Sequence, residues 1–241
     1  MAKTYEALLK SELSSHEEIL SVQSMSRWEC PDLTDTKEIG NLWNNIDTAR
    51  RTNAFKKVNF VGSRSGEGTS TIVFNLARFI MENTPGKDIL VIDANPGRPV
   101  INLAFGLPRA PGLGDVLMRK VEFSEAIHRV SSSNLYAMPA GVSPSDTSLR
   151  VEQENFSALI AAVQDKYQHI LIDSAPLLTS SDSIDTAIST DTTFLVVRAN
   201  STQWEVAEAA KNRLLEFNCN IGGVILNRVL QPIPRWIYNR L

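Results

Sequence analysis

The segment from Gly62 to Thr71 is rich in glycine and hydroxyl side chains, the residue types that bind phosphate groups. An apolar run over 58–61 precedes it, and a stretch with helical spacing over 70–82 follows it. Glycines let successive backbone N–H groups point inward, and the start of a helix adds a partial positive charge. The order of strand, glycine-rich turn and helix therefore predicts a cradle for the phosphates of ATP.

The segment lacks the lysine with which such loops ordinarily end. Thr69 stands at that position, whereas Ser70 keeps the hydroxyl that binds Mg²⁺ in loops of this type. A hydrogen bond to a charged group contributes about 1.5–3 kcal/mol, so we expect ATP binding to be weaker by about one to two decades. Arg64, five residues before Thr69, is the cation that would compensate; the alternative is that its side chain points into solvent.

Two aspartates follow apolar runs that are typical of buried strands. Asp93 follows the run 89–92, and Asp173 follows the run 170–172. Ligands of open parallel sheets bind at the carboxyl ends of the strands, where two such acids can hold Mg²⁺ beside phosphates. The alternative for each is a carboxylate that caps a loop or a helix. Because both aspartates occur in a chain with a phosphate loop, we favour the metal site over capping. Asp93, Asp173 and Ser70 would be its metal ligands, and Arg64 would be a catalytic cation.

These residues need a scaffold, and the remaining pattern alternates short apolar runs with helical stretches. The expected strands are 58–61, 89–92, 135–138, 170–172, 194–197 and 224–226. The expected helices between them are 70–82, 114–119 with 124–130, 148–166, 183–189 and 203–217. This alternation predicts an α/β fold with a mostly parallel sheet and helices on both faces. Residues 37–241 form this domain, beginning with a docked helix over 37–50, and residues 1–36 form a helical arm and linker.

Composition narrows the classes of function. The 241 residues are 43% hydrophobic and 21% charged, which indicates a folded protein. The net charge of -3 argues against the broad basic surface of a nucleic-acid-binding protein. The longest apolar runs fall far short of the roughly 18 residues that span a bilayer, and the first residues do not read as a secretory signal. We therefore expect a cytoplasmic protein without a nucleic-acid partner.

The segments around the two aspartates have a family resemblance. The sequence Asp93-Ala-Asn95-Pro-Gly-Arg98-Pro99 is similar to a second acidic motif, and Ile170-Leu-Ile-Asp173-Ser-Ala-Pro176 is similar to a Walker B motif. Connecting segments at 105–117, 139–141 and 225–229 match as well. Together they resemble the bacterial tyrosine autokinases of capsule and exopolysaccharide synthesis, which have a P-loop fold related to the partition and septum-site ATPases.

The resemblance implies an ATP-binding tyrosine kinase that controls polysaccharide polymerisation or export. Its partner would be a membrane polysaccharide co-polymerase or export-complex protein, which would hold the chain at the inner membrane. Asn227 and Arg228 fall where the related ATPases meet the base, and Arg64 falls at the offset of their second, phosphate-binding lysine. The residues implied to hold the phosphates are Gly66, Glu67, Gly68, Thr69, Ser70 and Thr71. Ser70 and Asp173 would bind Mg²⁺, and Asp93 would assist with metal or proton transfer.

The chain departs from this family at four places, of which the missing lysine is the first. Asn95 replaces the second acid of an Asp-x-Asp pair, and an amide cannot act as a base at neutral pH. Glu38, Asn41 and Asn44 have the spacing of the family's oligomerisation motif without its arginines. The resemblance therefore does not by itself predict a homo-oligomer, which we keep as an alternative. Only Tyr238 stands in place of a terminal tyrosine cluster. The alternatives are a pseudokinase regulator or scaffold of the same machinery, and a partition-type P-loop ATPase.

Overall fold

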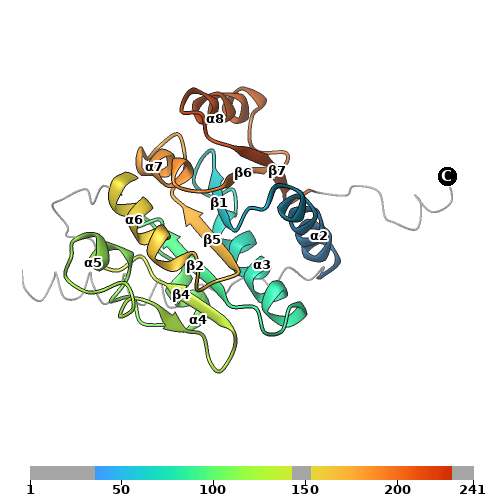
Figure 1. The fold of residues 1–241 in the computed structure, drawn as a ribbon. Coiled ribbons are helices and arrows are strands. Elements are labelled where there is room, and N and C mark those ends of the chain that lie inside the picture. The colour runs from blue at the N-terminus through green and yellow to red at the C-terminus, as the bar shows by residue number, and fades with distance from the viewer. Residues whose placement is uncertain (1–35, 143–152, 230–241) are drawn as a thin grey trace, which may run out of the picture. The chain divides into compact units, whose positions relative to one another are not determined.

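The computed structural model describes residues 36–142 and 153–229, which contain one seven-stranded sheet of order β3-β4-β2-β5-β1-β6-β7 (Figure 1). The strands are β1 Lys57–Gly62, β2 Ile89–Ala94, β3 His128–Arg129, β4 Leu135–Met138, β5 His169–Ser174, β6 Thr192–Arg198 and β7 Ile221–Asn227. Every neighbouring pair is parallel except β3 and β4. The predicted, mostly parallel sheet is confirmed.

Helices cover both faces of the sheet, as the alternating pattern predicts. They are α2 Thr36–Asn53, α3 Thr69–Asn83, α4 Ile101–Phe105, α5 Leu113–Leu117, α6 Gln153–Val163, α7 Asp182–Ile188 and α8 Trp204–Glu216. Helices α2, α3 and α4 lie over one face and α5 to α8 over the other (Figure 1). Apolar side chains of α2, α3 and α4 form one core with the first face, and those of α5 to α8 form two clusters on the other face. Ile39, Trp43 and Ile46 of α2 are buried, so the docked helix is confirmed.

The central strands β2 and β5 place the candidate site. All six residues of each are buried, as expected for a parallel strand that is covered on both faces. Their register pairs Asp93 with Asp173, so the two carboxylates lie side by side at the carboxyl end of the sheet. The strand β5 pairs with β2 on one side and with β1 on the other, and β1 leads into the phosphate loop.

One expected helix was wrong, and one observed helix was missed. The segment 124–130 is a turn followed by β3, because His128 and Arg129 pair with β4 and Val130 N–H bonds to the carbonyl of Leu135. This long-range pairing overrides the local helical pattern. The short helix α4 was not predicted. Residues 1–35 and 148–152 lie outside the described residues. The arm and linker, and the first five residues of the helix expected over 148–166, therefore stay predictions.

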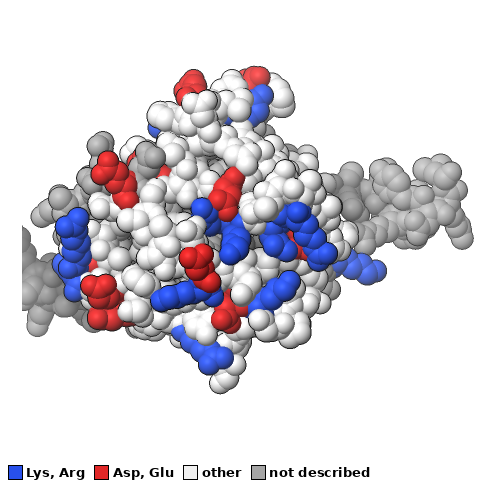
Figure 2. Space-filling model, in the orientation of Figure 1, with Lys and Arg blue, Asp and Glu red and all other residues white. Residues whose placement is uncertain are grey.

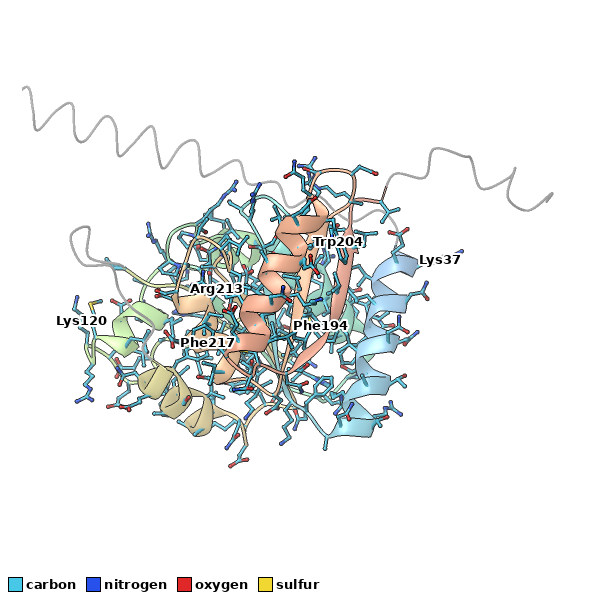
Figure 3. All side chains as sticks on the ribbon, turned by 90° about the horizontal axis from the view of Figure 1, so that it is seen from above. Lys37, Lys120, Phe194, Trp204, Arg213 and Phe217 are labelled. Atoms are coloured by element: carbon cyan, nitrogen blue, oxygen red, sulfur yellow. The ribbon has the colours of Figure 1, made fainter. Side chains whose placement is uncertain are left out.

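The last strand, β7, lies at the edge of the sheet beside α8. Trp204, the first residue of α8, lies on the side of the helix next to β7 and is 68% exposed (Figure 3). With the exposed Val224 and Leu226 of β7 it lines a groove of about 500 Å³.

On the face seen in Figure 2, basic and acidic side chains are interspersed and form no patch of one sign. Among the helices of the described ranges, none has the length and apolar character to cross a membrane.

Candidate functional site

The phosphate loop connects the end of β1 at Gly62 with the start of α3 at Thr69. Gly66 and Gly68 both have φ of +90°, a left-handed conformation that glycine adopts without steric cost. Gly68 is the N-cap of α3, and no side chain caps this helix. The first N–H groups of α3 therefore remain available to an anion, and they carry the positive end of a 15-residue helix. The predicted order of strand, turn and helix is confirmed.

The side chains of Thr69 and Arg64 show what the loop has in place of the missing lysine. Thr69 places its hydroxyl back against Gly62, where a Cβ would lie only 3.0 Å from Thr69 Oγ1. Arg64 is exposed, and its side chain has no ion pair or hydrogen bond within the described ranges. The loop thus presents one free guanidinium and no buried cation, and the compensating role of Arg64 stays a prediction.

Asp173 is fully buried, and apart from the nearby Ser70 hydroxyl its carboxylate oxygens have no hydrogen-bond donor in the described part of the chain. Burial raises the pKa of Asp173 well above its usual value, and the neighbouring Asp93 charge raises it further, whereas the nearby Ser70 hydroxyl lowers it. A buried carboxylate without a partner is costly unless a cation or a donor completes it. Asp173 and Ser70 are oxygen ligands of the kind that Mg²⁺ prefers, so this pair fits the ion.

The rest of a coordination shell would come from outside the protein. Nowhere in residues 36–142 and 153–229 do three or more His, Cys, Asp or Glu side chains gather as a metal cluster. Mg²⁺ usually keeps several waters and binds through one or two carboxylates together with phosphate oxygens of a substrate. The site therefore suits a Mg²⁺ ion that arrives with a nucleotide rather than one held by the protein alone.

Asp93 is equally buried but differently used. Its Oδ1 accepts a hydrogen bond from Asn95 N–H, and its Oδ2 accepts bonds from Val100 and Ile101 N–H, all at 3.1 Å. Burial raises the pKa of Asp93 to about 6, although these three bonds and the charge of Arg109 lower it. Asp93 thus caps the loop and the start of α4, the alternative weighed for either aspartate. Its role toward metal or protons stays a prediction.

A cleft of about 520 Å³ opens beside the phosphate loop. Its lining comes from the loop and from the segments that follow β2 and β5: Ser65, Asn95, Pro96, Gly97, Arg98, Ala175, Pro176, Thr179, Ser180 and Asp182. Sequence reasoning did not name Thr179, Ser180 or Asp182, although their position shortly after the strand that contains Asp173 was an available signal. The cleft gives a second molecule access to whatever the loop holds.

Asn227 and Glu67, both expected to touch nucleotide, contact each other. Asn227 Nδ2 donates a 2.8 Å hydrogen bond to the backbone carbonyl of Glu67, and Asn227 Oδ1 accepts one from Arg228 N–H. The Glu67 side chain is only 4% exposed and faces the protein interior. Arg228 is exposed. The structure therefore brings Asn227 to the phosphate loop, whereas contacts of these residues with a nucleotide stay predictions.

The sequence comparisons identify relatives of one kind. A family model described as an AAA domain matches residues 55–208, a range that contains the phosphate loop and both aspartates. The tyrosine-protein kinase YwqD of Bacillus subtilis (strain 168) is 26% identical over 197 residues, which cover 82% of each chain. The tyrosine-protein kinase ptk of Acinetobacter johnsonii is 28% identical over 162 residues, 67% of this chain and 22% of that protein. The chain thus spans most of one relative and a small part of the other.

Solved structures share the fold. The kinase domain of the Escherichia coli tyrosine kinase ETK matches with a TM-score of 0.75 at 22% identity, covering 81% of this chain and 76% of that one. The septum site-determining protein MinD of Pyrococcus horikoshii OT3, complexed with Mg-ADP, matches with a TM-score of 0.62 at 22% identity, covering 77% and 76%. The expected P-loop NTPase-type fold and the resemblance to bacterial tyrosine kinases are both confirmed.

Proposed function

This chain belongs to the AAA domain family, and from that membership we propose that it binds a Mg²⁺-nucleotide at the loop 62–71. The observation that carries the proposal is the buried carboxylate of Asp173, which has no donor among the described residues apart from the nearby Ser70 hydroxyl at the uncapped start of α3. The fold shared with MinD, which was solved with Mg-ADP, supports the same conclusion.

Each group of the site then has a separate task. Mg²⁺ would supply charge neutralisation at the outer phosphates when it is bound. Ser70 and Asp173 would hold the ion, and the N–H groups at the start of α3 would bind phosphate oxygens. Arg64 would bring a cation from the rim of the loop. Because Thr69 cannot supply the fixed charge of a lysine, phosphoryl transfer would be slow even where nucleotide binds.

The biological role follows from the kinship with bacterial tyrosine kinases. We propose that the chain regulates exopolysaccharide or capsule production together with a membrane co-polymerase or export-complex protein. The chain would act at the cytoplasmic side of the inner membrane through that partner. The cleft beside the loop, with Arg98 and Asp182 in its lining, would admit an acceptor side chain to the bound nucleotide.

A pseudokinase that binds nucleotide without transferring phosphate is the second candidate. Three observations favour it: Thr69 lacks a charge, Asn95 lacks a basic carboxylate, and Asp93 already accepts three backbone hydrogen bonds. In this case the nucleotide would order the site, and the surface of the domain would carry the signal to the partner.

Radiolabel transfer from γ-labelled ATP separates the two candidates. A slow kinase transfers label to tyrosine in the presence of Mg²⁺, more slowly after Arg64→Ala but unchanged after Lys120→Ala, an exposed control on the far segment after α5. A pseudokinase transfers none, yet binds a fluorescent ADP analogue with Mg²⁺. If neither transfer nor binding occurs, nucleotide recognition by this loop is wrong.

A further inference from the structure

The Glu67 side chain closes the phosphate loop from the inside. Its Oε1 accepts hydrogen bonds from the Ser63 hydroxyl at 2.5 Å and the Thr202 hydroxyl at 2.6 Å, and its Oε2 accepts one from Arg64 N–H at 3.0 Å. Ser63 and Arg64 belong to the loop itself, whereas Thr202 belongs to the segment after β6. A buried carboxylate is thus satisfied by three neutral donors, one of which lies 135 residues away along the chain.

Thr202 is held in the orientation that this contact needs. Its N–H donates to the Arg198 carbonyl at 2.9 Å, and its hydroxyl oxygen accepts a bond from Arg198 N–H at 3.1 Å. A hydroxyl has a single proton, and here that proton is donated to Glu67. The end of β6 therefore determines the position of the Glu67 carboxylate.

Asn227, the last residue of β7, makes a second attachment. Its amide donates to the Glu67 carbonyl, and its oxygen is held by Arg228 N–H. Arg228 has φ of +54°, a conformation that is unfavourable for a residue with a Cβ. Gly68 fits against the same amide, because a Cβ at Gly68 would overlap Asn227 Nδ2. Close packing at Gly68 and a strained backbone at Arg228 thus lie on either side of the Asn227 side chain.

We propose that Glu67, Thr202 and Asn227, the loop latch, are positioning residues that hold the phosphate loop in its binding shape before a ligand arrives. The latch ties the loop to the ends of β6 and β7. Because the loop is already ordered, ligand binding does not lose free energy to ordering it. This matters more here because, without a lysine, backbone N–H groups carry most of the phosphate contact. That last link rests on the proposed nucleotide site, whereas the order of the loop does not.

Amide hydrogen exchange of the ligand-free full chain tests the latch directly. The probe is Arg64 N–H, which bonds to Glu67 Oε2. Thr202→Val removes the hydroxyl at nearly constant shape, and we expect Arg64 N–H to exchange about 10- to 100-fold faster. Thr202→Ser keeps the hydroxyl and is expected to match the wild type. Thr190→Val is the control, since the Thr190 hydroxyl donates to the carbonyl of Ala187 in α7 and not to the loop.

Affinity for Mg-ADP is the second readout. Thr202→Val should raise the dissociation constant about 10- to 100-fold, whereas Thr202→Ser should bind as the wild type does. Asn227→Asp, which replaces the donating amide by a carboxylate of the same shape, provides the exchange readout if Thr202→Val does not fold, since its new charge beside the loop would itself repel a nucleotide.

The outcomes separate the latch from the proposed function. If the wild type does not bind Mg-ADP, the proposed nucleotide site is wrong, and the exchange rates still test whether the latch orders the loop. If Arg64 N–H exchanges at the wild-type rate in Thr202→Val and Asn227→Asp, the latch does not hold the loop and the inference is overturned. Equal loss of protection in Thr202→Ser would overturn it as well, because the effect would then be one of packing.

Discussion

Replacing Asp173 by asparagine should stabilise the ligand-free protein and abolish its response to Mg-nucleotide. Asp173 has a buried carboxylate whose oxygens have no donor among the described residues apart from the Ser70 hydroxyl, next to a second buried carboxylate at Asp93. Leaving a buried polar group unsatisfied costs about 1–3 kcal/mol, and more for a charged one. Asparagine has the same shape without the charge, so we expect Asp173→Asn to raise the free energy of unfolding by about 1–3 kcal/mol at pH 8.

The pH dependence of this gain has a definite sign. Because burial and Asp93 raise the pKa of Asp173, the folded wild type takes up a proton at a higher pH than the unfolded chain. The wild type therefore becomes more stable relative to Asp173→Asn as the pH falls through the folded-state pKa. The advantage of the variant is largest at high pH and shrinks in acid.

Urea unfolding at pH 8 and pH 5.5, without and with Mg-ADP, measures both effects. Mg-ADP should stabilise the wild type and leave Asp173→Asn unchanged, because a ligand stabilises only the state that binds it. Asp165→Asn, an exposed change of the same chemistry in the turn after α6, should behave as the wild type does throughout. A less stable ligand-free Asp173→Asn at pH 8, or an undiminished response to Mg-ADP, would refute the reasoning.

Three further changes have expected outcomes. Thr69→Lys restores the missing charge and should tighten Mg-ATP about 10- to 100-fold in a fluorescence titration; unchanged affinity would show that no phosphate lies at this position. Gly68→Ala adds a Cβ where φ is +90° and where it would overlap Asn227, so nucleotide-dependent stabilisation in a thermal melt should be lost. Burial, followed by the charges of Arg50 and Lys87, lowers the pKa of His169 to about 4, so the wild type should lose up to about 3 kcal/mol between pH 6.5 and 4. His169→Phe should remove that part of the acid sensitivity in urea titrations at pH 7 and 4.5, and an identical slope would contradict it.

Much of the scaffold was predictable because it rests on local patterns. Buried parallel strands such as Ile89–Ala94 are continuous apolar runs, and the segment from Gly62 to Thr71 has the glycines that its two left-handed turns require. Topology then places Asp93 and Asp173 together, since both follow strands that turn out to be neighbours.

The different uses of similar residues were not predictable. Asp93 and Asp173 occupy equivalent places in sequence, yet only Asp93 meets the N–H groups of a following loop. Glu67 is expected from the resemblance to touch the phosphates, but its partners Thr202 and Asn227 lie 135 and 160 residues further along the chain. Contacts at that separation depend on the assembled sheet, and periodicity has no information about them.

A calorimetric titration of the full chain with ATP, in Mg²⁺ and again in EDTA, tests the central claim most directly. We expect micromolar binding that requires Mg²⁺, disappears in Asp173→Asn and survives in Asp165→Asn. Absence of binding up to about 1 mM, equivalent to roughly -4 kcal/mol, would contradict a Mg²⁺-nucleotide site at this loop.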